Sequence, residues 1–352
     1  MQTIVITRLP LKSQLGGEEL HTLDVALFLR EQGFKVVFLS KCPVLKKLAK
    51  ENDFKFYNTH KLPSSPTSKV SLFFFGLFYG FSLIESLFWT GFVRLRHGQF
   101  KFYNLNLADK LLYGFWAKTF GIKSVFLEHA TIGKWLTKNP FLIVLKWICR
   151  SENIKVVTVS RRMQRGLENT LQTPVFEIRN GVKLQGSLDT NNVNSKQILF
   201  IGRLEKDKGF DIVCELAKKN PSLEFVCAGE GSLKHLASDV PNMTLLGFVN
   251  HSEIGDLYKN SSMLVLPSTT QDPFGLVVCE ALSFGCPVMC SDLVNASDYL
   301  DSQFVCRLNE FEYRFLDFYK KAPSRRKSAY RASLEFDQQQ MLRSYANFLN
   351  SL

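Results

Sequence analysis

The stretch QDPFGLVVCEALSFGCPV, residues 271–288, decides how the rest of the chain is interpreted. It places Asp272 and Glu280 with seven residues between them, and an apolar run begins after Pro-Phe-Gly. The run from Leu276 to Leu282 predicts a buried helix, ended by the glycine and proline that follow it. We therefore expect Asp272 just before a helix N-terminus and Glu280 about two turns further along.

The start of this helix is a candidate anion site. The N–H groups of Gly275, Leu276 and Val277 have no acceptor within a helix that begins here, so they are available to a phosphate. Carboxylates nearby can accept hydrogen bonds from sugar hydroxyls, so the stretch suits a nucleotide-sugar pocket. An ordinary capped helix in an α/β domain accounts for the same residues equally well.

The composition is that of a soluble globular protein with room for two domains. The chain has 352 residues, of which 45% are hydrophobic and 22% charged. Its eight cysteines form no CxxC pair, which favours reduced thiols in a cytosolic protein over disulfides or a zinc site. The N-terminal residues MQTIVITRLP show no basic segment leading into a long apolar core, so no signal peptide is expected.

The charge is unevenly distributed along the chain. Residues 1–180 contain 26 Lys and Arg against 12 Asp and Glu, a net of +14, whereas residues 181–352 contain 18 against 20, a net of −2. The first half is therefore expected to meet an anionic surface or acceptor. Nucleic acid is not expected, because no RNP motif, zinc-finger spacing or helix-turn-helix signature accompanies the charge.

Short β-branched runs alternate with helical patterns throughout the chain, starting with strands at Thr3–Thr7 and Lys35–Ser40. This alternation predicts parallel sheets. Between the first strand and the first helix lies the pair Gly16 and Gly17, where backbone can approach a ligand, although a simple turn explains it too. His129 follows a strand at the edge where ligands bind in such sheets; a structural histidine is the alternative.

Two further features leave their interpretation open. Val70–Val93 holds many Phe and only one charged residue, Glu85, and fits buried core helices, an interfacial membrane segment or a membrane span. Arg203 and Lys208 flank a turn after a strand, where they could hold a diphosphate from two sides; an exposed charged turn is the alternative.

Taken together, several motifs in the second half resemble the retaining glycosyltransferases of family 4. The motifs are RNGV at 179–182, IGRLEKDKG at 201–209, AGEG at 228–231, LLGFVNHSEIGDLY at 245–258 and MLVLPSTTQDPFGLVVCEALSFGCPVMCSD at 263–292. The first half matches more weakly, through Gly16-Gly17-Glu18, His129 and VTVS at 157–160.

The resemblance implies an α/β GT-B architecture, in which two Rossmann-like domains face each other across a cleft. Residues 1–185 would form the acceptor-binding domain and residues 186–335 the donor-binding domain, joined at the polar stretch 186–196. Residues 336–352 would form a C-terminal helix that packs back on the first domain. No metal or other cofactor is expected, since the chain has no DxD motif.

The resemblance also assigns roles to residues. Catalysis would depend on His129, which faces the transferred sugar, on Asp272, and on Arg203 and Lys208, which neutralise the diphosphate. Asp272 stands where the family has Glu, one methylene longer. Donor binding would involve Gly16, Gly17, Asn180, Arg203, Lys208, Glu230, Phe248, Val249, Asp272, Phe274, Gly275, Leu276, Val277 and Glu280.

The function so implied is retaining transfer of a hexose from a nucleotide-sugar to a glycan or lipid-linked anionic acceptor, in synthesis of polysaccharide, lipopolysaccharide or glycolipid. The enzyme would be cytoplasmic and peripheral on the inner face of the cell membrane, held by its basic, Phe-rich first half. A nucleotide-sugar epimerase or phosphorylase on the same fold is one alternative. A non-catalytic nucleotide-sugar-binding protein is another.

Overall fold

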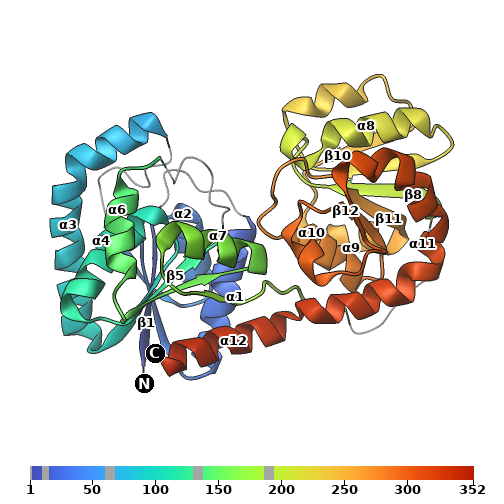
Figure 1. Cartoon of the computed structure of the whole chain (residues 1–352). Coiled ribbons are helices and arrows are strands. Elements are labelled where there is room, and N and C mark those ends of the chain that lie inside the picture. Colours follow the sequence, from blue (N-terminus) through green and yellow to red (C-terminus); the bar gives the residue numbers. More distant parts are fainter. Residues whose placement is uncertain (1, 10–15, 60–67, 130–137, 186–193) are drawn as a thin grey trace. The chain divides into compact units, whose positions relative to one another are not determined.

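The structure is a computed structural model that describes residues 2–9, 16–59, 68–129, 138–185 and 194–352 (Figure 1). The chain divides into two compact units, one comprising Met1–Ile178 with Leu342–Leu352 and the other Arg179–Met341. Each unit is built on one parallel sheet with helices packed against it, which confirms the predicted α/β class.

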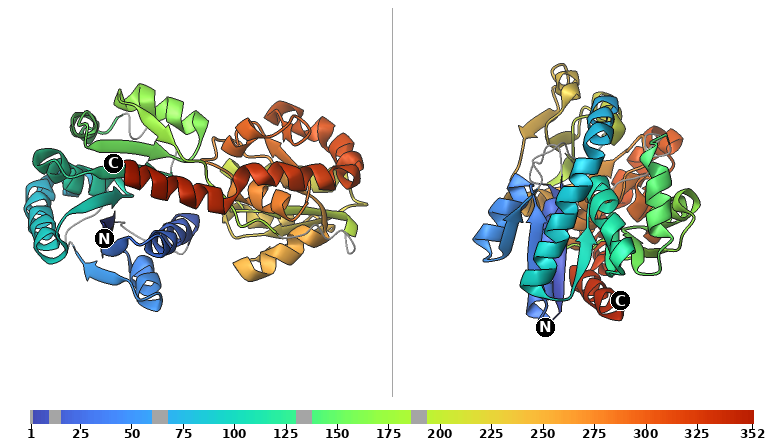
Figure 2. Two further views of the ribbon diagram at one scale, coloured as in Figure 1. Left: turned by 90° about the horizontal axis from the view of Figure 1, so that it is seen from below. Right: turned by 90° about the vertical axis from the view of Figure 1, so that its left-hand side faces the viewer.

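The first unit contains a sheet of order β3-β2-β1-β4-β5-β6-β7. Its strands are β1 (Thr3–Arg8), β2 (Lys35–Ser40), β3 (Lys55–Asn58), β4 (Phe100–Asn104), β5 (Ser124–Glu128), β6 (Ile154–Thr158) and β7 (Val175–Glu177). Its helices are α1 (Gly17–Glu31), α2 (Pro43–Glu51), α3 (Lys69–His97), α4 (Leu107–Phe120), α6 (Phe141–Cys149) and α7 (Arg161–Leu171). Helices α1 and α2 pack together. Helices α3, α4, α6 and α7 form a second group, in which each helix packs on the next (Figures 1 and 2).

The second unit contains a sheet of order β10-β9-β8-β11-β12-β13. Its strands are β8 (Asn194–Ile201), β9 (Glu224–Ala228), β10 (Met243–Gly247), β11 (Ser261–Leu266), β12 (Val288–Ser291) and β13 (Val305–Cys306). Its helices are α8 (Phe210–Lys219), α9 (His251–Asn260), α10 (Leu276–Ser283) and α11 (Phe311–Ser333), and α12 (Gln338–Ser351) begins in this unit. Runs such as SSMLVL in β11 are buried along their whole length, as expected for a parallel strand covered on both faces.

The contacts within each unit place the boundary between residues 178 and 179, whereas the sequence placed it between residues 185 and 186. The reason is that residues 179–185 pair with the end of the chain. Val182 forms a parallel bridge with Asp337, and the Tyr330 hydroxyl donates to the Gln185 carbonyl, 2.7 Å away. Most of the predicted connection, residues 186–193, lies outside the described residues, and β8 already begins at Asn194.

Two helices differ from the sequence-based expectation. The Phe-rich segment, for which the sequence leaves three interpretations open, is one helix, α3, that exposes many of its apolar side chains, so it is not a fully buried core helix. By length and composition α3 could cross a membrane. The apolar pattern of residues 134–150 also predicts a helix, but α6 begins only at Phe141: residues 138–140 are not helical, and residues 130–137, which include Trp135, lie outside the described part.

The C-terminal segment contains a break close to residue 336, where the family resemblance led us to expect the last helix to begin. Helix α11 ends at Ser333, a single 3₁₀ turn covers Leu334–Phe336, and α12 follows. The second half of α12 packs within the first unit, where the Leu349 carbonyl accepts a hydrogen bond from the Lys101 ammonium, 2.5 Å away.

Candidate functional site

The sheet of the second unit has its topological switch point between β8 and β11. The chain runs outward from β8 to β9 and β10, then returns to place β11 on the other side of β8. In open parallel sheets ligands bind at the carboxyl ends of the strands at such a point. The loop after β8 carries Lys208 and the loop after β11 carries Asp272, so two predicted site residues meet there.

Lys208 and Asp272 form an ion pair, with 2.5 Å between the Lys208 Nζ and Asp272 Oδ2 atoms. The Lys208 side chain is 22% exposed and the Asp272 side chain 8% exposed. Because both groups are largely removed from water, their attraction is less screened than that of a surface pair. The cation is thus held at the switch point.

The loop that carries Asp272 is fixed by its own backbone and side chain. Asp272 Oδ1 accepts from the Phe274 N–H, 3.2 Å away, and the Asp272 backbone forms a parallel bridge with Val294. Gly275 has φ +84°, and a Cβ at this position would lie 2.3 Å from the Val294 Cγ1 atom. Only glycine combines this conformation with this close approach.

Helix α10 then begins at Leu276, as predicted, with Gly275 as its N-cap residue. The first amides of a helix lack intrahelical acceptors, and the helix dipole adds positive potential there; the Val278 N–H, third in α10, already donates to the Gly275 carbonyl, 2.9 Å away. Glu280 lies in the second turn, and its Oε2 atom accepts from the Tyr258 hydroxyl, 2.8 Å away. Tyr258, on α9, is buried and was not predicted as a site residue, although it ends the motif LLGFVNHSEIGDLY.

The turn after β8 packs directly on the turn after β9. Gly229 has φ +140°, and a Cβ there would lie 1.9 Å from the Gly202 carbonyl oxygen. The Glu205 carboxylate accepts from the Ser232 N–H and from the Ser232 hydroxyl, each 2.7 Å away. These hydrogen bonds lower the pKa of Glu205, since they favour its charged form.

The other predicted residues of this unit lie on the surface around that packed turn. The Arg203 side chain is 64% exposed and pairs with Asp207. Glu230 is exposed, and its Oε1 atom lies beside Gly247. Phe248 is 79% exposed, and Val249 after it is partly buried.

Asn180 is connected to the same loop through aromatic rings. Its neighbour Arg179 stacks on Tyr299, with 3.9 Å from the guanidinium carbon to the ring centroid. Tyr299 in turn contacts Phe274, which is buried. The Asn180 Oδ1 atom is buried and has no hydrogen-bond partner in the described part of the chain. The sequence indicated Asn180 and Phe274 but not Tyr299.

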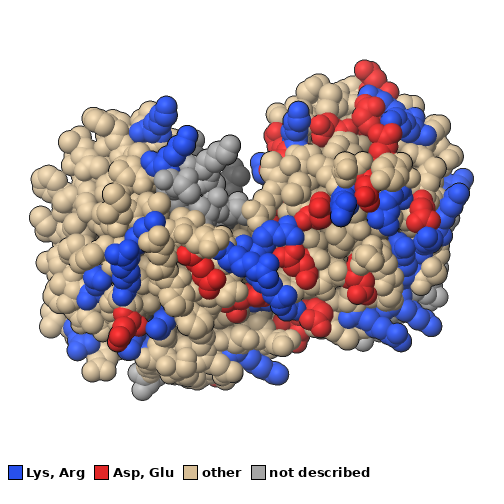
Figure 3. Space-filling model, viewed as in Figure 1, with Lys and Arg blue, Asp and Glu red and all other residues tan. Residues whose placement is uncertain are grey.

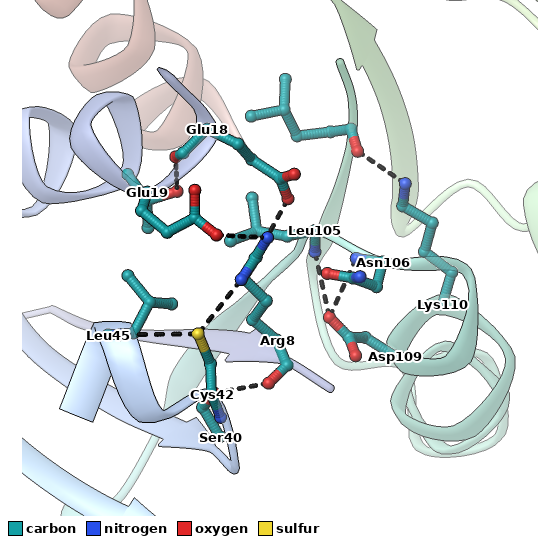
Figure 4. Close-up of polar contacts among 12 residues, drawn as sticks. Arg8, Glu18, Glu19, Ser40, Cys42, Leu45, Leu105, Asn106, Asp109 and Lys110 are labelled. Carbon is teal, nitrogen blue, oxygen red and sulfur yellow. Dashed lines mark hydrogen bonds and ion pairs between the residues drawn. The ribbon is translucent and has the colours of Figure 1, made fainter. Parts of the chain in front are cut away.

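The first unit has its own switch point, between β1 and β4. Arg8, at the carboxyl end of β1, lies between two carboxylates (Figure 4). Its Nε atom is 3.1 Å from the Glu18 Oε1 atom, and its Nη2 atom is 2.7 Å from the Glu19 Oε1 atom. Glu18 and Glu19 belong to the first turn of α1, whose first residue is Gly17 and whose N-cap is Gly16. The sequence pointed to the two glycines but not to this ion cluster.

His129 follows β5 in the first unit, in contact with a second histidine. The rings of His129 and His21 meet edge-on with centroids 4.6 Å apart, and His21 also contacts Tyr345 of α12. The His129 Nε2 atom is buried and unpartnered among the described residues. Burial, with the nearby charges of Lys110 and Arg8, lowers the pKa of His129 to about 3. His129 is therefore a neutral imidazole at pH 7.

This lowered pKa predicts a pH-dependent stability. The unfolded chain binds a proton at His129 near pH 6.5, whereas the folded chain does so only near pH 3, so stability present above pH 6.5 is lost as the pH falls. Between pH 7 and pH 5 we expect the titration of His129 to lower the free energy of unfolding by about 2 kcal/mol. Urea unfolding of the native protein and of His129→Asn measures this difference, because the variant lacks the titrating group. Equal pH slopes in the two proteins would contradict the assignment.

Comparison with known proteins relates the second unit to a family of glycosyl transferases. Residues 189–307 match the family model described as glycosyl transferases group 1. An uncharacterized 42.6 kDa protein in the cps region of Klebsiella pneumoniae is 42% identical over 118 residues, 32% of this chain and 31% of that protein. An uncharacterized glycosyltransferase of Haemophilus influenzae is 26% identical over 84% of both chains. Phosphatidyl-myo-inositol mannosyltransferase of Mycobacterium tuberculosis is 26% identical over 47% of this chain and 48% of its own.

Solved structures match over the whole chain. A glycosyltransferase from Rickettsia africae superposes with a TM-score of 0.79 at 17% identity, covering 99% of this chain and 98% of the other. Anabaena Alr3699/HepE in complex with UDP and glucose superposes with a TM-score of 0.74 at 17% identity, covering 100% of both chains. This chain therefore has the GT-B fold, and its second unit carries the domain of the group 1 glycosyl transferases.

Proposed function

We propose that this protein is a retaining glycosyltransferase that moves a hexose from a nucleotide-sugar to a glycan or lipid-linked anionic acceptor. The observation that carries the proposal is the Lys208–Asp272 pair at the switch point, directly before the amides that begin α10. A diphosphate needs cations and free N–H groups, and a sugar needs a carboxylate for its hydroxyls; here the three are adjacent.

In the proposed reaction the bond between the sugar C1 and the diphosphate oxygen breaks, and negative charge grows on the diphosphate. Lys208, Arg203 and the first-turn amides of α10 stabilise that charge where it develops. Asp272 accepts hydrogen bonds from the sugar, and Glu280, oriented by Tyr258, holds the ribose hydroxyls. The acceptor oxygen attacks C1 from the face that the diphosphate leaves, and a phosphate oxygen takes its proton.

We also propose that no metal takes part, because Arg203, Lys208 and a helix N-terminus supply the positive potential that a metal would otherwise provide. The proposed place of action is the cytosolic face of the cell membrane, in polysaccharide, lipopolysaccharide or glycolipid synthesis. Two observations support it: the net charge of +14 over residues 1–180 and the exposed apolar side of α3. The name of the mycobacterial relative, a phosphatidyl-myo-inositol mannosyltransferase, supports an acceptor of this kind.

Donor binding is the first test. Calorimetry against UDP-, GDP-, ADP- and dTDP-sugars is expected to find one class that binds, and Arg203→Ala is expected to weaken its Kd about tenfold or more by removing one charge-assisted contact. Lys206→Ala is the matched control: Lys206 is also an exposed cation of the same turn but has no assigned role, and its Kd should be unchanged. Binding of no donor, or equal binding by both variants, would contradict the proposal.

A further inference from the structure

Helix α3 exposes far more apolar surface than a helix on the surface of a soluble domain. A stripe at helical spacing along its outer side carries six apolar residues, each more than 60% exposed: Val70, Phe73, Leu77, Phe81, Ile84 and Phe88. We call these six residues the α3 stripe. In a soluble domain such residues face the core and polar residues face water. A continuous apolar surface of this kind marks an interaction site.

The side of α3 that packs on the first unit carries apolar residues, of which Phe75 and Val93 are buried in the core, together with small polar ones. Ser82, Ser86 and Thr90 are buried. Trp116 of α4 donates from Nε1 to the Ser86 Oγ atom at 2.9 Å and to the Leu83 carbonyl at 3.0 Å. These hydrogen bonds fix the rotation of α3 about its axis, so the stripe points away from the unit.

The same contacts decide against a helix that crosses the bilayer. A crossing helix would be surrounded by lipid or by other membrane helices, whereas α3 lies against α4 through Ser86 and through the Tyr79 hydroxyl, which donates to the Leu111 carbonyl at 3.2 Å. With α4 in place, only the outer side of α3 is available to an apolar phase. The helix therefore suits a position parallel to the bilayer surface.

Charged residues on α3 fit an anionic lipid surface. Lys69 at the first position and Arg94 and Arg96 in the last turn are exposed. The one acidic residue of the helix, Glu85, is partly buried and interacts electrostatically with Lys41. The left side of Figure 3, where α3 runs, shows few charged side chains. An apolar strip with cations at both ends matches acyl chains below a layer of anionic headgroups.

A second copy of the chain fits the stripe less well. In a two-fold pair with α3 antiparallel to its mate, Lys69 would approach the arginines at the other end of the partner helix. In a parallel pair each cation would approach its own copy. Both arrangements bring like charges together at both ends of the contact, which opposes association.

We propose that the α3 stripe is the surface with which this protein docks, lying flat, on a bilayer containing anionic lipids. The inference deepens the membrane location proposed above, but it does not depend on sugar transfer. Its test therefore uses no donor and no acceptor, so its failure would leave the proposed reaction untouched.

The test is flotation of the full-length protein with vesicles of phosphatidylcholine, with or without phosphatidylglycerol. The native protein is expected to float with the anionic vesicles. The variant Phe73→Ser/Phe81→Ser/Phe88→Ser is expected to partition about 100-fold less into them, because it lacks three phenyl groups that the bilayer would bury. The matched control is Tyr313→Ser/Leu316→Ser/Leu334→Ser, three exposed apolar residues of the second unit, which should float like the native protein. Lys69→Ser/Arg94→Ser/Arg96→Ser should reduce binding to anionic vesicles only.

Three outcomes would overturn the proposal. In the first the native protein does not float, and in the second the Phe variant floats as well as the native protein. The third outcome is that the native protein is a dimer on size-exclusion chromatography and the Phe variant a monomer.

Fluorescent labels distinguish a helix that lies flat on the bilayer from one that crosses it. All eight native cysteines are buried, so thiol labels attach at Val70→Cys, Leu77→Cys or Phe88→Cys. Quenching by lipids with spin labels at known depth is expected to be equal at the three sites, and a depth gradient would contradict the flat position.

Discussion

Lys208→Met is expected to lower kcat/KM for sugar transfer by about 1,000-fold or more, because it removes the largely buried cation that, in the proposed reaction, stabilises the leaving diphosphate. The single variant also leaves the Asp272 carboxylate, 8% exposed, without its partner. An uncompensated charge of this kind destabilises a protein by about 3–5 kcal/mol. A loss of activity in the single variant therefore has two explanations.

The double variant Lys208→Met/Asp272→Asn separates them. It removes both charges, so the free energy of unfolding should return toward the native value while transfer remains lost. Release of nucleoside diphosphate from the bound donor measures the chemistry without requiring the acceptor. Lys206→Met, an exposed lysine two residues earlier in the same turn, should keep native activity. More than a tenth of native kcat/KM in a folded double variant would mean that Lys208 has no catalytic role.

The fold was accessible from the sequence because its signals are local. β-Branched runs of four to six residues can hardly be helices when turn residues bound them, and TIVIT and KVVFLS both became central parallel strands. The start of α10 was equally clear, since Gly275 and the apolar run after it fix the boundary. No glycine or proline marks the break at Leu334–Phe336, so only the family resemblance, and not a local signal, placed the start of the last helix near residue 336.

The site was only partly accessible, because its contacts join residues far apart in sequence. Motif matching named both Lys208 and Asp272, but their ion pair depends on the strand order that puts β8 beside β11. Tyr258 was missed since its hydroxyl reaches Glu280 only through the packing of α9 on α10. The packed side of α3 was visible in principle: Ser82, Ser86 and Thr90 recur at intervals of four, and that spacing indicates the side that faces the unit.

The second large effect is expected at Gly229, in the turn after β9. This residue has φ +140°, and the Cβ of an alanine would lie 1.9 Å from the Gly202 carbonyl oxygen. The obstacle is backbone at the end of the neighbouring strand β8, so a side-chain rotation cannot relieve it. Gly229→Ala must therefore separate the two turns, and we expect a loss of at least about 4 kcal/mol in the unfolding free energy of the second unit.

The distribution of tryptophan makes this effect measurable for one unit at a time. All four tryptophans, at positions 89, 116, 135 and 147, belong to the first unit. Gly229→Ala should therefore lose helical circular dichroism and donor binding while the tryptophan emission keeps its folded spectrum. Gly166→Ala is the control, because Gly166 lies exposed within α7 with nothing within 4 Å of an added Cβ, and alanine should stabilise that helix by about 0.5–1 kcal/mol. Donor binding by Gly229→Ala at native affinity would show that the packing of the turn after β9 on the turn after β8 is not what shapes the site.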